Sequence, residues 1–222
     1  LNGTVGILTL SNFTCYVFIL GFNHNAALEG ASRIHFAFGK TARTGGTDIA
    51  FCDSQYNRVG TTAAFRMNLN GKNEGGWKNS FMRNTICKEF QNCLPAELRA
   101  ALKTVVKYTD NVTGVPNNII PPASNVTATT DTIFLLGAFE ISTKTSNANQ
   151  FEADKQRQYS YYSAGNSMIK HNHAIVTTGV MCFVRSLGKN HAQNFVCTHP
   201  SLESFSSQGA NQSIGFSPAF CV

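Results

Sequence analysis

Short apolar runs separated by polar segments make up the hydrophobic pattern of this chain. In these runs β-branched and aromatic residues follow one another over the length of a strand, which is typical of buried β-strands. The clearest run is FTCYVFIL at 13–20, and IHFAF at 34–38 follows it. Further runs that predict strands lie at 104–108, 132–136, 180–186, 194–198 and 215–222.

A second pattern, with apolar residues on one face of a 3.6-residue period, predicts amphipathic helices. It occurs in two segments, 80–90 and 94–103, and a third segment, 152–165, is also expected to be helical. In the second, Leu94, Leu98 and Leu102 form one stripe that we expect to pack on a sheet. Gly165 can terminate the third helix, since glycine is favoured just after a helix end.

The polar segments between these elements predict long loops. Gly39 to Gly76 holds seven glycines, and 110–131 is rich in Asn, Thr and Pro. Short strands mixed with two or three helices indicate an α+β fold. No internal repeat or charge block divides the chain, so we expect one domain over residues 1–222 with short antiparallel strands and long polar loops.

Composition restricts the class of protein. The 222 residues include 17 Phe, with 42% hydrophobic and 14% charged residues, which excludes intrinsic disorder. No run approaches the ~18 apolar residues of a membrane span, and Phe13 to Phe22 lacks the flanks of a signal peptide. The net charge is +6, but the basic residues are scattered. A nucleic-acid partner is therefore not expected, because such proteins concentrate positive charge on one face.

Sequence motifs for catalysis and for metal binding are missing. The seven cysteines form no CxxC pair, and the His171 and His173 pair has no cysteine nearby in sequence, so we expect no metal and no cofactor. Buried free thiols are the simplest interpretation of the cysteines. No nucleophile elbow, zinc-protease motif or phosphate-binding loop occurs. A Cys–His pair could still serve a hydrolase, so a Cys-dependent hydrolase stays as an alternative to a non-enzymatic protein.

Several sequence pieces, taken together in order, resemble one bacterial and phage domain family. They are FGKTA (38–42), AFCDSQY (50–56), GGWKNSFMRN (75–84), LPAELRAALKTVVKYTDN (94–111), TTDTIFLL (129–136), RQYSYYSAGNS (157–167), VRS (184–186), NFVC (194–197) and GFSPAFCV (215–222). Its members resemble the variable ligand-binding proteins of diversity-generating retroelements, which are abundant in gut phages. This chain departs from the family pattern at Met181 to Leu187, where the usual Trp pair and the Pro after Arg-Ser are lost.

The resemblance implies a C-type-lectin-like fold in which the N- and C-terminal strands pair, here 13–20 with 216–222. It also implies that the ligand is bound by a variable region at about 181–216, diversified by adenine-directed mutagenesis. The positions expected to contact ligand are Phe183, Leu187, Lys189, His191, Gln193, His199, Ser201, Glu203, Phe205, Ser207, Asn211 and Ser213. A polar meander without binding function is the alternative interpretation of this segment.

Ligand chemistry follows from the residues available in that region. Calcium-dependent sugar binding needs several carboxylates, and 187–222 contains only Glu203. Amide, hydroxyl and aromatic side chains are instead typical of adaptable binding surfaces. These residues indicate a protein or glycan receptor on a cell surface, and the resemblance implies that several copies are displayed on a virion. A bacterial surface adhesin with the same site is the alternative carrier.

Overall fold

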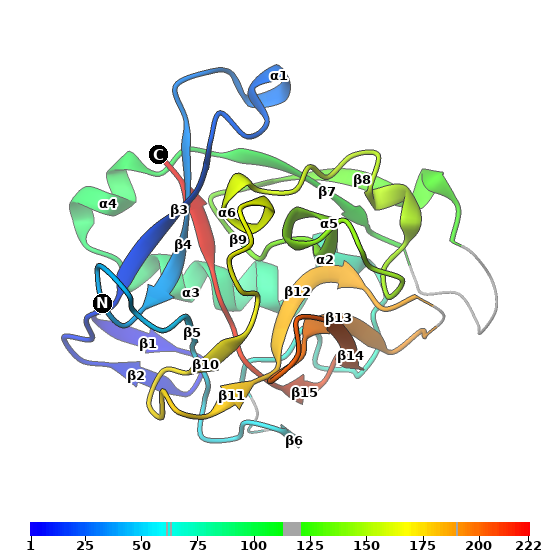
Figure 1. Ribbon diagram of the computed structural model, residues 1–222. Coiled ribbons are helices and arrows are strands. Elements are labelled where there is room, and N and C mark those ends of the chain that lie inside the picture. The colour runs from blue at the N-terminus through cyan, green and yellow to red at the C-terminus, as the bar shows by residue number, and fades with distance from the viewer. Residues whose placement is uncertain (61, 63, 113–120, 190) are drawn as a thin grey trace.

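The computed structural model describes residues 1–60, 62, 64–112, 121–189 and 191–222, and these form a mostly β structure (Figure 1). The described residues contain sixteen strands in six small sheets. Six α-helices accompany them, and each is only four to six residues long. The expected α+β, C-type-lectin-like fold is therefore wrong, because short strands rather than helices make up most of the regular secondary structure of the described residues.

The elements follow one another closely along the chain. The strands are β1 (Gly3–Val5), β2 (Leu8–Leu10), β3 (Tyr16–Phe22), β4 (Ile34–Lys40), β5 (Ile49–Ala50), β6 (Arg58–Val59), β7 (Val105–Asp110), β8 (Val126–Asp131), β9 (Ile133–Phe134), β10 (Lys170–Asn172), β11 (Gly179–Val180), β12 (Cys182–Leu187), β13 (Asn194–Thr198), β14 (Phe205–Gly209), β15 (Gln212–Ser213) and β16 (Ala219–Cys221). The helices are α1 (Ala26–Glu29), α2 (Gly76–Asn79), η1 (Met82–Ile86, a π-helical turn), α3 (Cys87–Asn92), α4 (Ala96–Ala101), η2 (Ala123–Asn125), α5 (Ala138–Ile141), η3 (Gln150–Glu152) and α6 (Ser160–Ser163).

The largest sheet ties the two ends of the chain together through a strand that lies between them. Its order is β3-β4-β16-β9, and β4 is antiparallel to both β3 and β16. Phe36 of β4 and Phe220 of β16 are register partners with stacked rings. The expected direct pairing of 13–20 with 216–222 is therefore wrong. The sequence pattern identified the strand at 34–38 but carries no information on its neighbours in the sheet.

A three-stranded meander, β12-β13-β14, carries most of the region expected to bind ligand (Figure 1). β13 pairs with β14 in continuous antiparallel register from Asn194 opposite Gly209 to Thr198 opposite Phe205. The pairing of β12 with β13 shifts register between Phe183 and Leu187. The outer edge of β12 is also covered, since the amide of Phe183 donates to the Gly215 carbonyl and that of Arg185 to the Leu136 carbonyl.

The helical segments differ in how well the sequence period predicted them. The helix expected at 80–90 is confirmed by η1 and α3, whose Met82, Ile86 and Phe90 are buried. The stripe expected on the next helix is confirmed in part: Leu94 is buried, and Leu98 and Leu102 are partly buried and pack against the core, although α4 itself has no fully buried residue.

The prediction of one continuous helix over 152–165 is wrong, because only α6 and the last residue of η3 are helical in that segment. The side chain of Glu152 accepts the amide proton of Asp110, and the carboxamide of Gln156 donates to the Tyr108 carbonyl. Both side chains are buried, and their hydrogen bonds to β7 hold this segment in a non-helical conformation.

The two long loops contain more structure than expected. β5 and β6 lie within 39–76, and β8 ends the segment 110–131 by pairing with β7 over six residues. Residues 113–120, in the middle of that second segment, lie outside the described residues. The main hydrophobic core joins residues from Val5 to Cys221, with Trp77 fully buried inside it, and a smaller cluster contains Ala50, Cys52, Val180 and Cys182. None of the helices in the described residues has the length and apolarity needed to cross a bilayer.

Candidate functional site

Three of the positions expected to contact ligand lie inside the protein. Phe183 and Leu187 of β12 are 2% and 3% exposed, because both faces and both edges of this strand are covered. Ser213 is fully buried, and its hydroxyl lies 2.9 Å from each carboxylate oxygen of Asp53. These three expectations are wrong, since side chains without accessible surface cannot contact a ligand.

The turn between β12 and β13 combines a fixed backbone with free side chains. Its carbonyls at His191 and Asn194 accept protons from the side-chain amide of buried Asn73, at 2.7 and 3.0 Å. The amide of Lys189 donates to the Asn147 carbonyl at 2.7 Å. The side chains of His191 and Gln193 remain exposed. Asn190, between Lys189 and His191, lies outside the described residues.

The turn between β13 and β14 is held in a different way. The carboxylate of Glu203 accepts the amide proton of Met168 at 2.9 Å and the hydroxyl proton of Ser167. Glu203 therefore anchors the turn, although it was expected to contact ligand. The amide of Ser201 donates to Nδ1 of His199 at 3.2 Å, which orients the imidazole along the turn. Ser201 and Leu202 are exposed at its tip.

β14 lies alongside β13 and extends from one turn to the other. Phe205, Ser207 and Asn211 are all half-buried, and Ser207 accepts a proton from the amide group of Asn194 at 3.3 Å. We call the accessible residues of this region the hairpin surface. They are Lys189, His191, Gln193, His199, Ser201, Glu203, Phe205, Ser207 and Asn211.

The spacing of the turns indicates the size of ligand that the hairpin surface can hold. The two turns lie at opposite ends of β13, Asn194–Thr198, which spans about 16 Å at the usual rise of a strand. A small molecule cannot reach both turns at once. An interface of about 800 Å² per partner, usual for protein complexes, would cover both.

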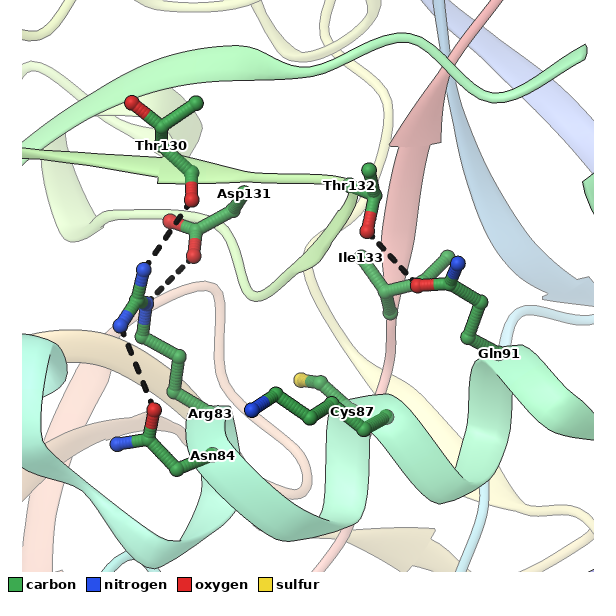
Figure 2. Close-up of a pocket in the computed structure, with 9 residues that line it drawn as sticks. Arg83, Asn84, Cys87, Gln91, Thr130, Asp131, Thr132 and Ile133 are labelled. Carbon is green, nitrogen blue, oxygen red and sulfur yellow. Dashed lines mark hydrogen bonds and ion pairs between the residues drawn. The ribbon is translucent and has the colours of Figure 1, made fainter.

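Apart from the hairpin surface, a cavity of about 150 Å³ lies between the η1–α3 helical segment and the β8–β9 strands (Figure 2). Figure 2 shows Arg83 reaching from the helix to Asp131 and Gln91 reaching to Thr132, so that a polar pair closes each end. Cys87 and Ile133 lie between the pairs.

The polar groups of this cavity are largely satisfied by one another. Asp131 accepts protons from Arg83, from the indole of Trp77 at 3.0 Å and from the hydroxyl of Thr129 at 2.7 Å. Arg83 also donates to the carbonyls of Lys78 and Thr130. Burial raises the pKa of the Cys87 thiol well above its usual value. The cavity is therefore lined by hydrogen bonds that join the η1–α3 segment to the β8–β9 strands. Its cysteine, Cys87, is not an activated nucleophile.

A cluster of buried charges stabilises the structure behind the hairpin surface. Glu140 accepts protons from Lys107 at 3.0 Å and from Arg185 at 2.6 Å, and all three side chains are at most 2% exposed. Burial opposes ionisation of Glu140, but its pKa is held well below the usual value by Arg185 and Lys107. Sequence reasoning missed this cluster. Its signal was a single charged residue inside each apolar strand, Lys107 in TVVKY and Arg185 in VMCFVRS.

The seven thiols are free and share one property. Burial raises the pKa of each: to about 11 for Cys15, to about 12 for Cys182 and Cys197, and above the usual value for Cys52, Cys87, Cys93 and Cys221. In the part of the chain that the structure describes, no three His, Cys, Asp or Glu residues form a group that could hold a metal ion.

Comparisons with known proteins place the chain in a family without assigning an activity. A family model described as a domain of unknown function, DUF6273, matches residues 59–222. No curated protein and no solved structure matches the chain. The matched segment covers most of the chain and includes the whole hairpin surface. The chain therefore belongs to the DUF6273 family.

Proposed function

We propose that this chain is a non-enzymatic binding domain that holds a macromolecular receptor on its hairpin surface. The observation that carries the proposal is a contrast: the first turn is fixed by buried Asn73 and the second is anchored by Glu203, whereas side chains such as His191, Gln193 and Ser201 are exposed to solvent. A rigid frame with exposed, chemically varied side chains lowers the entropy cost of binding and suits recognition.

The chemistry of the hairpin surface supports a protein or glycan receptor. Its accessible residues offer hydroxyls, amides, imidazoles and one half-buried aromatic ring, with Lys189 and Glu203 as the charged members. Such groups combine hydrogen bonding with contact area. The about 16 Å between the turns favours a large partner over a small substrate. The raised pKa of all seven thiols argues against a cysteine nucleophile, since the thiolate is the reactive form.

The proposed carrier is a phage virion, and the proposed receptor is a molecule of a bacterial cell surface. This part of the proposal is supported by the resemblance to variable retroelement proteins. It predicts that related genes differ mainly at codons for exposed residues of 189–211, with Phe183, Leu187 and Ser213 kept because they are buried. Substitutions spread evenly along related genes would contradict it.

A cell-binding assay tests the binding proposal directly. The biotinylated chain, tetramerised on fluorescent streptavidin, is incubated with intact cells from a panel of bacteria. We expect at least one strain to be stained, and Ser201→Arg to reduce staining about tenfold or more, because a new charge at the interface costs several kcal/mol. Ser124→Arg is the matched control, since Ser124 is also exposed but lies in η2, outside the hairpin surface. Equal staining by both variants would contradict the proposed site.

A further inference from the structure

A second pocket, distinct from the hairpin surface, lies where the end of β3 meets the segment leading into α6. It has a volume of about 500 Å³, within the range of ligand sites in proteins. Its walls come from Gly21, Phe22 and His24 on one side, from 156–163 on the other, and from Thr143. We call it the β3–α6 pocket. Figure 1 shows α6 beside the sheet that contains β3.

The charge of the β3–α6 pocket favours an anionic ligand. Arg157 is exposed at its wall, and its guanidinium has no hydrogen-bond or ion-pair partner among the described residues. Among the residues that the structure describes, no acidic side chain lines the pocket. Guanidinium groups bind carboxylates through two parallel hydrogen bonds. One arginine without a second cation suits a single carboxylate better than a phosphate.

The remaining polar groups are fixed in place and keep hydrogen-bonding capacity toward the pocket. Gln158 donates its amide proton to the Ile141 carbonyl at 2.8 Å, which leaves its side-chain oxygen as an acceptor. Ser160 donates to the Leu20 carbonyl at 3.0 Å and retains its oxygen lone pairs. Thr143 is exposed and supplies a further hydroxyl. These groups match a ligand that carries several hydroxyls.

His24 forms a rigid wall of the pocket and is itself incompletely bonded. Its ring stacks on the buried ring of Tyr159 at 3.6 Å, and it is 8% exposed. Its Nε2 has no hydrogen-bond partner among the described residues. Burial lowers the pKa of His24 to about 3, so the imidazole is neutral and offers a donor and an acceptor in place of a second positive charge.

An aromatic ring at the rim completes the arrangement. The side chain of Phe22 is 63% exposed, and among the described residues it is the one phenylalanine with so much accessible surface. An exposed ring beside hydroxyl and amide groups provides an apolar platform for a ligand with one apolar face. A pyranose has such a face, formed by its ring C–H groups.

We propose that the β3–α6 pocket binds a carboxylated sugar residue, with Arg157 pairing the carboxylate, Phe22 stacking on the sugar ring, and Gln158, Ser160 and Thr143 hydrogen-bonding its hydroxyls. The site is independent of the hairpin surface, since the two share no residue. A chain with both sites would contact an acidic glycan and a larger receptor with different parts of its surface.

Titration with methyl glucuronide, followed by calorimetry or by NMR shifts, tests this site. We expect saturable binding with a Kd of about millimolar order, and about tenfold weaker binding of neutral methyl glucoside, because a charge-assisted pair is lost. Arg157→Ala should weaken glucuronide binding by about tenfold or more, and Phe22→Ala by about fivefold.

Matched variants separate the site from general electrostatics. Lys155→Ala removes the same charge two residues from Arg157, outside the pocket lining, and should leave the Kd within about twofold. Ile19→Ala removes an exposed apolar side chain from the same strand as Phe22 and should have no effect. The proposal is overturned if wild type shows no saturable binding, if glucoside binds equally, or if Lys155→Ala loses as much as Arg157→Ala. Equal binding of inorganic phosphate, unaffected by Phe22→Ala, would also overturn it. The cell-binding assay with Ser201→Arg tests the hairpin surface alone, so its result does not depend on whether the β3–α6 pocket binds glucuronide.

Discussion

At the scale of single residues, Glu140 balances two buried cations. Its carboxylate is the partner of both Lys107 and Arg185, and none of the three reaches solvent to a useful extent. Arg185 also donates to the hydroxyl of Thr109 and to the Leu135 carbonyl, both at 2.8 Å. Loss of the carboxylate would therefore remove the ion-pair partner of two buried cations at once.

The substitution Glu140→Gln is expected to lower the free energy of unfolding by about 3–5 kcal/mol, the cost of breaking a buried ion pair from one side. Urea unfolding followed by circular dichroism measures the change. Glu97→Gln is the matched control, because Glu97 is exposed on α4. A loss below about 1 kcal/mol would show that the cluster is not held by Glu140.

Glu152 predicts a pH dependence of stability. Burial raises its pKa from 4.5 to about 7, against the opposing hydrogen bonds from Ser186 and Asp110 and the charge of Arg185. Between these pH values the folded chain binds a proton that the unfolded chain has lost. The contribution of Glu152 to stability is thus fully present below pH 4.5 and falls as the pH rises toward 7, by about 3 kcal/mol in total.

The measurement is the difference between wild type and Glu152→Gln, each unfolded in urea from pH 4.5 to 8. Burial lowers the pKa of His24 and His173, which act in the opposite direction and cancel in this difference. We expect wild type to lose stability relative to the glutamine variant as the pH rises. A constant difference, or one of opposite sign, would contradict the protonated state of Glu152.

At the scale of elements, the turn from His199 to Ser204 depends on a glycine in a neighbouring strand. A Cβ atom at Gly179 of β11 would lie 2.0 Å from the Pro200 carbonyl oxygen, a distance that no packed structure tolerates. The close approach of β11 therefore sets the position of this turn, together with the anchoring of Glu203.

Gly179→Ala should displace the turn and reduce stability by about 1–3 kcal/mol, as overpacking does elsewhere. Thermal unfolding gives the size of the loss. Gly209→Ala in β14 provides the comparison, because a Cβ there meets only the Asn211 side chain at 3.4 Å. If both variants unfold at the wild-type temperature, the packing of Pro200 on Gly179 does not position the turn.

The elements also show what the sequence pattern could and could not predict. Apolar runs located β3, β4, β7, β12 and β13 to within a few residues, since buried strands need continuous apolar stretches. The pattern failed for 152–165, where the side chains of Glu152 and Gln156 form hydrogen bonds inside the protein. Long-range hydrogen bonds of this kind leave no periodic signal.

At the scale of the whole molecule, the largest difference between the sequence prediction and the structure is the fold class, which is mostly β instead of α+β. Many two- and three-residue strands, such as β5, β6, β11 and β15, are too short to produce alternation in the sequence, so the β content was underestimated. The C-terminal region expected to bind ligand was implied by the family resemblance, and its polar residues indicated exposed turns. Neither signal predicted that Phe183, Leu187 and Ser213 are buried within that region, because their burial depends on contacts with distant segments at Leu136 and Asp53.

The central claim is that a rigid C-terminal frame carries side chains free to differ, and a folding selection tests it most directly. Each position from 181 to 213 is randomised singly, and the library is sorted for resistance to protease. Most replacements of His191, Gln193 and Ser201 should change the free energy of unfolding by less than about 0.5 kcal/mol, whereas polar replacements of Phe183 and Leu187 should cost about 3 kcal/mol or more. Equal intolerance at the exposed and the buried positions would contradict the account.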